Sequence, residues 1–406
     1  MRVLYCTDTW PPQVNGVSVV TALSVDGLRQ RGWETHVIAP RYPDELTASP
    51  GALHIGDHPP STRNGTGGLG VTSIASAPLP LYADVRLAAP DIAAVSDAIA
   101  RFQPDLVHCA TEFVIGRLGQ LAAARAGIPF VSSFHTDFGR YASAYGLPWL
   151  AGSVRGYLGR FHARAHRTYT PSSVSRDDVV RLGAREVEVW GRGVDTGTFS
   201  PAHRSAAVRQ RLRLDDAFTV LHVGRLAPEK SVDIVLDAFT RAADARPDLS
   251  LRLVVAGAGP SERHLRERAH PGTSWLGNLR RDDELPALYA SADCFAFAST
   301  TETLGLVVLE AMASGLPVIA VPQGGVRDHL RDRVNGLEVP ARDAAAFAAA
   351  IIALADDAAL RTRLGAGARI TAEALDWSRE MDRLDASYRE VCGDARATRE
   401  KIPAAG

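Results

Sequence analysis

Short apolar runs of strand length alternate with longer amphipathic stretches along the first half of the chain. Four runs predict buried strands, at residues 2–6, 36–39, 106–109 and 129–132. Three amphipathic patterns predict helices, at residues 17–31, 89–101 and 116–126. Because strands that alternate with helices pair in parallel, this order predicts an α/β domain built on a doubly wound parallel sheet.

The second half repeats this order after a polar and charged stretch. Residues 196–216 have the composition of a linker, so we expect one domain at 1–195 and another at 196–376. The second domain opens with an apolar run at 218–223, the loop G-R-L-A-P-E-K-S at 224–231 and a helical pattern after it. Its other predicted strands are 251–256, 275–277, 294–298 and 317–321, and its other predicted helices are 285–290, 344–354 and 358–374.

The stretch S-T-T-E-T-L-G-L-V-V-L-E-A-M-A-S-G, residues 299–315, predicts a loop that leads into a helix. Ser299 and Glu302 have the spacing of a capping box, and an apolar run follows them. Gly315 stands where a left-handed C-cap is expected. We therefore expect the helix to begin near Thr303 and to end at Gly315.

The start of this helix is a candidate anion site. The free N–H groups of Thr303, Leu304, Gly305 and Leu306 would point out of it, and a bulky side chain at Gly305 would obstruct a phosphate. Glu302 and Glu310 have the residue type of a glycosidase pair, but eight helical residues would separate them by about 12 Å. No apolar pocket for a protonated acid is evident around either one, so different roles for the two are favoured.

Length and composition limit the classes of protein. A chain of 406 residues with 46% hydrophobic content is too long for one core and fits two domains of about 200 residues each. The net charge of −1 argues against a general nucleic-acid binder. The four cysteines are scattered without zinc-type spacing, and no Asp-x-Asp occurs, so we expect no metal. Since the start lacks a signal-peptide pattern and no run could span a bilayer, a cytoplasmic location is expected.

The segment from Gly139 to Arg176 is locally basic and aromatic. It contains no Asp or Glu, while six arginines are interleaved with tyrosines and other apolar residues. The pattern fits a solvated helix with an ordinary apolar face, and it also fits a surface for anionic lipid. The second interpretation would allow peripheral contact with the inner face of the cell membrane.

Two loops carry groups suited to phosphate. Arg225 and Lys230 flank the turn after a buried strand, where two fixed cations suit a diphosphate, although a solvated loop has the same composition. Asn15 and Gly16 precede the first helix, and N–H groups at its start could also meet a phosphate. A plain Asn–Gly turn explains that second pattern equally well.

His135 follows the predicted strand at 129–132, at the edge where doubly wound sheets place ligands. A lone histidine near a strand is more often a packing residue, and Asp137 would face the opposite side, so we do not pair the two as base and orienting residue. The G-A-G-P sequence at 257–260 lacks the third glycine of a dinucleotide fingerprint, and we interpret it as a tight structural turn.

Four motifs together resemble glycosyltransferase family four, whose members have the GT-B fold of two Rossmann-like domains. They are N-G-V at 15–17, S-F-H-T at 133–136, G-R-L-A-P-E-K-S at 224–231 and the E-x7-E stretch from 302 to 310. The resemblance spans nearly the whole chain. It implies retaining transfer of a sugar from a nucleotide diphosphate donor without a metal. The second domain would hold the donor and the first domain the acceptor.

The resemblance also implies roles for individual residues near the nucleotide. Arg225 and Lys230 would bind the diphosphate and stabilise the leaving charge, and Gly16 would contact it from the first domain. Glu310 would bind the ribose hydroxyls. The last amphipathic stretch, about 377–395, would cross back to complete the first domain.

The remaining roles concern the transferred sugar. Glu302 would hold its hydroxyls, the amides of Leu304 and Gly305 would meet the sugar or a phosphate, and His135 would sit near the reacting carbon. Thr303 stands where many family members have Gly, which bears on the shape of this loop and on sugar preference.

The donor has two candidates. W-G-R-G-V-D-T-G-T-F at 190–199 looks most like bacterial mannosyltransferases that use GDP-mannose on lipid acceptors, and this donor is favoured. G-R-L-A-P-E-K-S-V-D also looks like enzymes that use UDP-sugars to make sulfolipid. A non-catalytic sugar-nucleotide-binding module and a nucleotide-sugar epimerase share the fold and stay as alternatives. A nicotinamide oxidoreductase is disfavoured because no complete glycine fingerprint exists.

Overall fold

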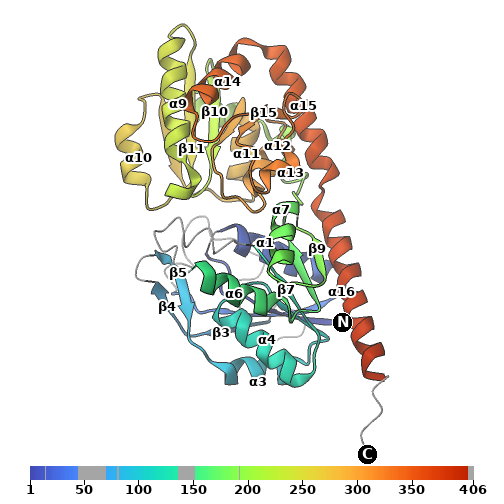
Figure 1. Ribbon diagram of the computed structural model, residues 1–406. Coiled ribbons are helices and arrows are strands. Elements are labelled where there is room, and N and C mark those ends of the chain that lie inside the picture. The colour runs from blue at the N-terminus through green and yellow to red at the C-terminus, as the bar shows by residue number, and fades with distance from the viewer. Residues whose placement is uncertain (14, 44–69, 80–81, 136–150, 192, 401–406) are drawn as a thin grey trace, which may run out of the picture. The chain divides into compact units, whose positions relative to one another are not determined.

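The computed structural model describes residues 1–13, 15–43, 70–79, 82–135, 151–191 and 193–400 (Figure 1). Its contacts divide the chain into two compact units. The first consists of Met1–Gly191 with Ser378–Gly406, and the second of Arg192–Trp377. Each unit is built on its own parallel sheet.

The first unit contains a seven-stranded sheet with the order β3-β2-β1-β6-β7-β8-β9, in which all neighbours are parallel. The strands are β1 (Arg2–Cys6), β2 (Glu34–Pro40), β3 (Gly70–Ile74), β6 (Leu106–Cys109), β7 (Phe130–Ser133), β8 (Arg167–Thr170) and β9 (Val187–Val189). The four strands predicted from apolar runs are therefore confirmed. A separate antiparallel pair, β4 (Ser76–Leu79) with β5 (Tyr82–Ala88), was not predicted.

Helices lie on both faces of this sheet because successive strand residues point to opposite sides. Leu4 and Cys6 of β1 belong to a buried cluster with residues of α3 (Ile92–Phe102) and α4 (Val114–Ala126), which lie side by side in Figure 1. Tyr5, between them, instead bonds the Tyr388 hydroxyl of α16 (Trp377–Glu400) at 2.9 Å. The other described helices are α1 (Gly16–Gln30), α6 (Ala151–His162) and α7 (Ser173–Arg181).

The last helix, α16, is fixed to the first unit by aromatic and polar contacts. The indole of Trp33 donates to Asp385 at 2.6 Å, and the indole of Trp190 donates to the Glu380 carbonyl at 2.8 Å. Arg31 forms an ion pair with Asp382 at 2.7 Å. No helix among the described residues is long and apolar enough to cross a membrane.

The second unit contains a six-stranded parallel sheet with the order β12-β11-β10-β13-β14-β15. The strands are β10 (Phe218–Val223), β11 (Leu251–Ala256), β12 (Thr273–Gly277), β13 (Cys294–Phe297), β14 (Val318–Ala320) and β15 (Gly336–Glu338). Its helices are α8 (Ala206–Arg211), α9 (Val232–Ala245), α10 (Glu262–Arg268), α11 (Glu284–Ser291), α12 (Leu306–Ala313), α13 (Val326–His329), α14 (Ala344–Asp356) and α15 (Ala358–Ala374).

The core of the second unit lies between the sheet and two helices that run side by side, α9 and α14 (Figure 1). Val220 and Val255 from the strands, Phe239 from α9 and Phe347 from α14 are all fully buried in it. The core holds the carboxyl ends of the strands in place. The loops that leave these ends carry the candidate site residues.

Candidate active site

The loop after β10 carries the two predicted cations, Arg225 and Lys230. Gly224 has φ +157°, and a short 3-10 turn over Pro228–Lys230 leads to α9. The loop lies against the turn at 257–260, where a side chain at Gly257 would come within 2.0 Å of the Gly224 carbonyl. The G-A-G-P sequence is thus a close-packed structural turn, as expected. It supports the loop that carries Arg225 and Lys230, because the Leu226 amide donates to the Ala258 carbonyl at 3.0 Å.

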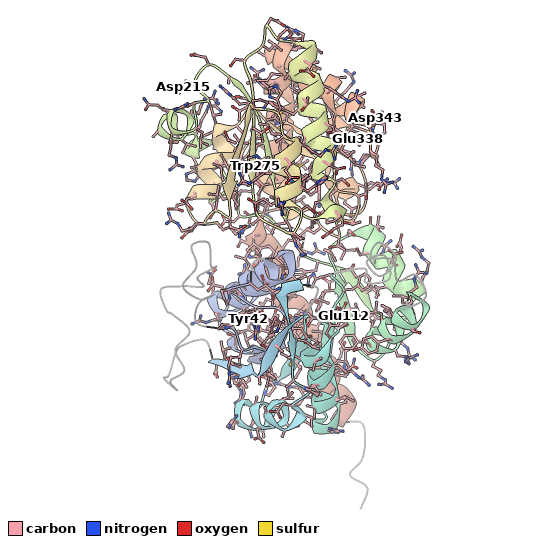
Figure 2. All side chains as sticks on the ribbon, turned by 90° about the vertical axis from the view of Figure 1, so that its left-hand side faces the viewer. Tyr42, Glu112, Asp215, Trp275, Glu338 and Asp343 are labelled. Atoms are coloured by element: carbon pink, nitrogen blue, oxygen red, sulfur yellow. The ribbon has the colours of Figure 1, made fainter. Side chains whose placement is uncertain are left out.

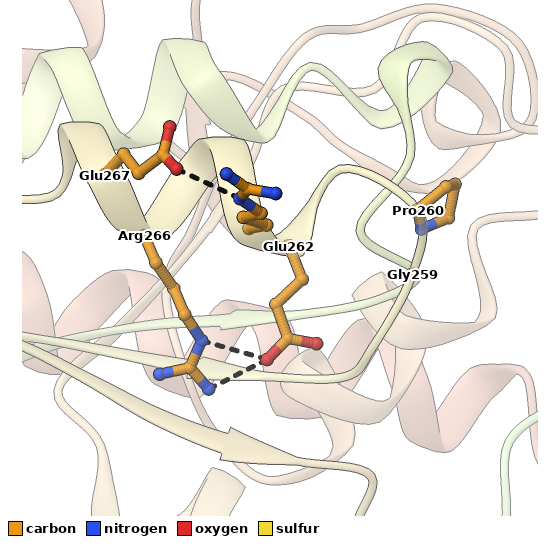
Figure 3. A pocket seen from close by; sticks show the side chains of 6 residues that line it. Gly259, Pro260, Glu262, Arg266 and Glu267 are labelled. Carbon is orange, nitrogen blue, oxygen red and sulfur yellow. Dashed lines mark hydrogen bonds and ion pairs between the residues drawn. The ribbon is translucent and has the colours of Figure 1, made fainter.

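A shallow pocket opens beside that turn (Figure 3). Gly259, Pro260 and four residues of α10 line it, and Glu262 pairs there with Arg266 at 2.8 Å. Arg266 also stacks over the ring of Trp275, at 5.0 Å from its centroid. The charged side chains that line the pocket form ion pairs with one another.

Lys230 and Glu302 lie in direct contact. The Lys230 ammonium donates to the Glu302 carboxylate in a short ion pair, although the two residues are 72 positions apart. Only 17% of the Lys230 side chain and 14% of the Glu302 side chain is exposed. The structure therefore brings together two residues that the sequence placed in separate motifs, at one edge of the second sheet.

The loop before α12 differs from the prediction. The helix begins at Leu306 rather than near Thr303, and Gly305 precedes it with φ +78°. Ser299 and Glu302 do not form a capping box, because the Ser299 hydroxyl contacts the Glu229 carbonyl at 3.4 Å and Glu302 binds Lys230. Contacts with the cationic loop thus draw residues 299–305 out of the helix.

The end of α12 agrees with the prediction. Gly315 has φ +76°, and its N–H donates to the Met312 carbonyl at 3.0 Å. The left-handed conformation that ends the helix favours glycine because a side chain would be strained there. This part of the pattern depended only on local sequence.

Free amide groups lie at the start of α12. Within the described part of the chain, nothing accepts a hydrogen bond from the N–H groups of Leu304, Gly305 or Leu306. A turn at Gly324–Gly325 supports this loop, because side chains there would come within 2.0 Å of the Glu302 carbonyl and 2.3 Å of the Thr303 carbonyl. The two supporting glycines were not identified from the sequence.

Glu310 is buried in α12, with 3% of its side chain exposed. Its Oε1 accepts from the Arg281 guanidinium at 2.6 Å, and its Oε2 lies 3.1 Å from the Tyr289 hydroxyl. Burial raises the pKa of the carboxyl, and Arg281 opposes that shift. Since Glu302 and Glu310 each bind a different basic residue, they do not form an acid–base pair.

Sequence reasoning did not identify Arg281 or Tyr289. Arg281 lies in the loop between β12 and α11, and Tyr289 lies in α11. The Arg281 guanidinium also stacks over the Phe199 ring, 4.8 Å from its centroid. Nothing in the local pattern R-R-D-D-E indicates which of its charges turns inward.

His222 on β10 has an unsatisfied nitrogen. Its Nδ1 bonds the Ala296 carbonyl at 3.0 Å, and no group in the described ranges bonds its buried Nε2. Burial lowers the pKa of the imidazole to about 4, so it is neutral at pH 7. Nε2 faces Gly224, at 3.6 Å from where a side chain there would begin.

In the first unit, Gly16 begins α1 and Asn15 is its N-cap. Asn15 Oδ1 accepts from the Ser18 amide at 2.9 Å, and Ser18 Oγ accepts from the Asn15 amide at 3.2 Å. This reciprocal cap identifies the Asn–Gly pair as a helix start rather than a plain turn. A side chain at Gly16 would meet no described atom within 4 Å, so local packing does not require glycine there.

His135 lies just beyond β7 and is partly buried. Removal from water lowers the pKa of its imidazole to about 4. The preceding serines are fixed by histidines, with Ser133 Oγ 2.7 Å from His108 Nε2 and Ser132 Oγ 2.9 Å from His162 Nδ1. The strand end that carries His135 is therefore held by buried hydrogen bonds. Asp137 falls outside the described residues.

A buried pair of a carboxylate and an imidazole also lies in the first unit. Glu112, labelled in Figure 2, lies 3.4 Å from Nε2 of His162, and both side chains are nearly inaccessible to water. Burial raises the pKa of Glu112, and His162 opposes the shift. Sequence reasoning did not identify this pair, because the two residues are 50 positions apart and neither lies in a recognisable motif.

The basic aromatic segment is described from residue 151 onward, and residues 139–150 fall outside the described ranges. On α6, the apolar Leu158 and Phe161 are buried in the core clusters of the first unit. Arg155 and Arg160 are exposed on the other side of the helix. The apolar residues of α6 are thus used for packing, and its outer face is basic.

No group of three or more metal-ligating side chains occurs among the residues that the structure describes. The site supplies two cations, Arg225 and Lys230, and the free N–H groups at the start of α12. Cations and N–H groups both stabilise a phosphate without a change in their own protonation state.

Comparisons with known proteins decide the family. A model described as Glycosyltransferase Family 4 matches residues 14–198, and one described as Glycosyl transferases group 1 matches residues 217–357. The chain is 35% identical over 340 residues to the GDP-mannose-dependent alpha-mannosyltransferase of Mycobacterium tuberculosis strain CDC 1551 / Oshkosh, covering 84% of each chain. This chain belongs to glycosyltransferase family 4. The resemblance drawn from its motifs is confirmed, and it is a hexosyltransferase.

Other relatives of this family 4 member support the fold. Sulfoquinovosyl transferase SQD2 of Arabidopsis thaliana is 33% identical over 313 residues, covering 74% of this chain and 60% of SQD2. The crystal structure of Anabaena HepE with UDP and glucose matches with a TM-score of 0.72 at 19% identity, covering 96% of this chain and 99% of HepE. The predicted GT-B fold is confirmed.

Proposed function

We propose that this family 4 enzyme transfers a hexose, with mannose favoured, from a nucleotide diphosphate donor to a lipid or other glycan-type acceptor, with retention of configuration. The observation that carries the proposal is the contact between Lys230 and Glu302 beside the free amides of Leu304 and Gly305. A cation, a carboxylate and unpaired N–H groups at one sheet edge are the groups that a sugar diphosphate requires.

The residues have the following proposed roles in the second unit. Lys230 and Arg225 bind the diphosphate, Glu302 accepts hydrogen bonds from hydroxyls of the donor sugar, and the amides of Leu304 and Gly305 bind the sugar or a phosphate oxygen. Glu310 binds the ribose hydroxyls. Cleavage of the sugar–phosphate bond leaves negative charge on the diphosphate, and fixed cations and amides stabilise that charge without a metal.

Two residues of the first unit complete the proposal. We propose that the Gly16 backbone binds a phosphate oxygen of the donor; its place at a capped helix start, with open space where a side chain would stand, supports this role. We propose that His135 acts near the reacting carbon. As its pKa is lowered to about 4, its imidazole is neutral at pH 7 and can accept or donate a hydrogen bond there.

GDP-mannose is the favoured donor. The 35% identity to a GDP-mannose-dependent alpha-mannosyltransferase over most of both chains supports it. A UDP-sugar is the second candidate, since the similarly folded HepE was crystallised with UDP and glucose. The discriminating experiment is a thermal-shift screen with GDP, UDP and ADP, in which a ligand at 100 times its Kd adds about 2.7 kcal/mol of stability.

A panel of nucleotide sugars tests the reaction itself. The proposal predicts slow release of nucleoside diphosphate from the sugar nucleotide that carries the selected base. No nucleotide binding together with no turnover of any donor would contradict it. Release of an isomerised sugar nucleotide without an acceptor would indicate an epimerase instead.

The proposed peripheral contact with a membrane has a separate test. Exposed arginines on α6 attract anionic headgroups, and this attraction weakens as salt rises. The protein is expected to sediment with phosphatidylglycerol vesicles at low salt and to be released at high salt. The double variant Arg155→Gln/Arg160→Gln should bind less. Equal recovery with neutral phosphatidylcholine vesicles would argue against membrane contact.

A further inference from the structure

Arg281 and Tyr289 surround Glu310 from outside its own helix. Arg281 binds one carboxylate oxygen at 2.6 Å, and the Tyr289 hydroxyl lies 3.1 Å from the other and 3.2 Å from the Val307 carbonyl. A carboxylate offers about four acceptor positions. With one position used on each oxygen, two acceptor positions are left on a carboxylate whose orientation is fixed from two sides.

One aromatic ring supports both partners. Phe199 is fully buried, and its ring lies under the Arg281 guanidinium at 4.8 Å and packs edge-on against Tyr289 at 5.7 Å. Arg369 holds the Phe199 backbone by donating to its carbonyl at 2.9 Å. Phe199 is the last residue of the motif W-G-R-G-V-D-T-G-T-F. It contacts Arg281, which in turn binds Glu310, so the motif supports the Glu310 carboxylate indirectly.

The neighbouring Arg280 has a different environment. Half of its side chain is exposed, and it pairs with Asp283 on the same loop. Only 19% of the Arg281 side chain is exposed. Arg280 thus pairs within its own loop, whereas Arg281 binds the buried Glu310 carboxylate. A substitution of Arg280 is therefore a matched control for one of Arg281.

We infer that Arg281, with Tyr289, is a positioning residue for the ribose: it fixes the Glu310 carboxylate, charged and correctly oriented, so that the free acceptor positions receive the two ribose hydroxyls of the donor. The inference rests on the proposed role of Glu310 in nucleotide binding. The support by Phe199 argues that Arg281 stays in place when the donor binds, rather than covering Glu310 and swinging away.

Protonation of Glu310 is part of this role. The groups that act on the carboxylate are Arg281 from the preceding loop and Tyr289 from α11. Arg369 on α15 contacts α12 at its last turn, where it donates to the Ala313 carbonyl at 2.6 Å and not to Glu310. Without Arg281, burial alone would raise the pKa of Glu310 further, so the carboxyl would take up a proton at a higher pH.

The test compares GDP with 2′,3′-dideoxyguanosine diphosphate, with UDP and its dideoxy analogue measured in parallel, by titration calorimetry. For wild type and Arg280→Met, the ribose form is expected to bind at least tenfold more tightly than the dideoxy form. For Arg281→Met, the ribose form should lose about tenfold in affinity while the dideoxy form changes less than twofold. The loss should grow as pH falls.

Three results separate the possible failures. Tighter GDP binding by Arg281→Met would show that Arg281 merely covers the site, and equal loss of both ligands would show a general structural role. Each of these overturns the inference. If wild type binds neither GDP nor UDP, the proposed function fails first. Tyr289→Phe keeps the packing and removes one hydrogen bond, so an unchanged ribose preference in this variant would contradict the role of Tyr289.

Discussion

The ion pair between Lys230 and Glu302 leads to a prediction in which two neighbouring substitutions act in opposite directions. The Lys230 ammonium is bound to the Glu302 carboxylate, and both side chains are mostly buried. If Lys230 binds the diphosphate, then Glu302 competes with it. Glu302→Gln is therefore expected to strengthen binding of GDP, which carries no sugar, while Lys230→Met weakens it.

The magnitudes follow from the burial of the pair. Two unit charges about 4 Å apart attract by about 4 kcal/mol at an effective dielectric constant of 20, before desolvation is subtracted. After subtraction, a charged hydrogen bond contributes about 1.5–3 kcal/mol. Loss of Lys230 should weaken GDP binding by about 10- to 150-fold. Removal of the competing charge at Glu302 should tighten GDP binding by about tenfold, equivalent to about 1.4 kcal/mol.

Titration calorimetry with GDP at low and moderate salt measures both effects. Asp233→Asn is the control, because it neutralises a different carboxylate, on the first turn of α9. Turnover of the sugar nucleotide should fall in Glu302→Gln even as GDP binds more tightly, since contacts with the sugar are lost. If Glu302→Gln weakens GDP binding as much as Lys230→Met does, Glu302 does not compete with the diphosphate and the reasoning is wrong.

Three further predictions concern single side chains. His135→Gln should lower turnover by about 100-fold with donor affinity nearly unchanged, and an equal loss of binding would place His135 outside the reaction. Gly305→Ala should lower the free energy of unfolding by about 1–2 kcal/mol, because its φ is +78° and the new side chain would lie 3.0 Å from Val326; an unchanged Tm would contradict this. Burial lowers the pKa of His108 to about 3 in the folded protein, below the value of about 6.5 in the unfolded chain. As the pH falls below about 6.5, the unfolded chain takes up a proton that the folded protein does not, so the free energy of unfolding decreases. Urea unfolding at pH 7 and pH 5 should show a smaller loss of stability in His108→Gln than in wild type, and equal losses would refute this contribution.

The sequence was sufficient wherever an apolar run and its boundary residues lie together. β10 and β11 have the predicted bounds because a mainly apolar run in each ends at a glycine. α15 has its predicted bounds because Asp357 caps its start and Leu360 donates to that cap. Gly315 likewise ends α12 through its own backbone conformation.

Prediction failed where distant contacts override local preference. Ser299 and Glu302 have capping-box spacing, yet the loop at Glu229 and Lys230 holds them instead, and α12 begins three residues later than expected. β3 was missed because only the last of its five residues, Ile74, is buried, so the strand carries little apolar signal. These structures depend on partners tens of residues away.

The candidate site shows the same division. Motifs identified Arg225, Lys230 and Glu302, which follow strands, and Glu310, which completes the E-x7-E spacing within α12. Arg281 lies among four other charged residues, and only the fold turns it toward Glu310. The supporting residues of the site depend on packing and could not be predicted from local pattern.

The proposed function rests on transfer from a nucleotide sugar with retention of configuration. Proton NMR during slow hydrolysis of GDP-mannose by the wild-type enzyme measures this stereochemistry, because the anomer released first records the configuration at the reacting carbon. We expect release of GDP, with α-mannose appearing first and mutarotating afterwards. β-Mannose appearing first, or no release of sugar from GDP-mannose or any UDP-sugar, would contradict it.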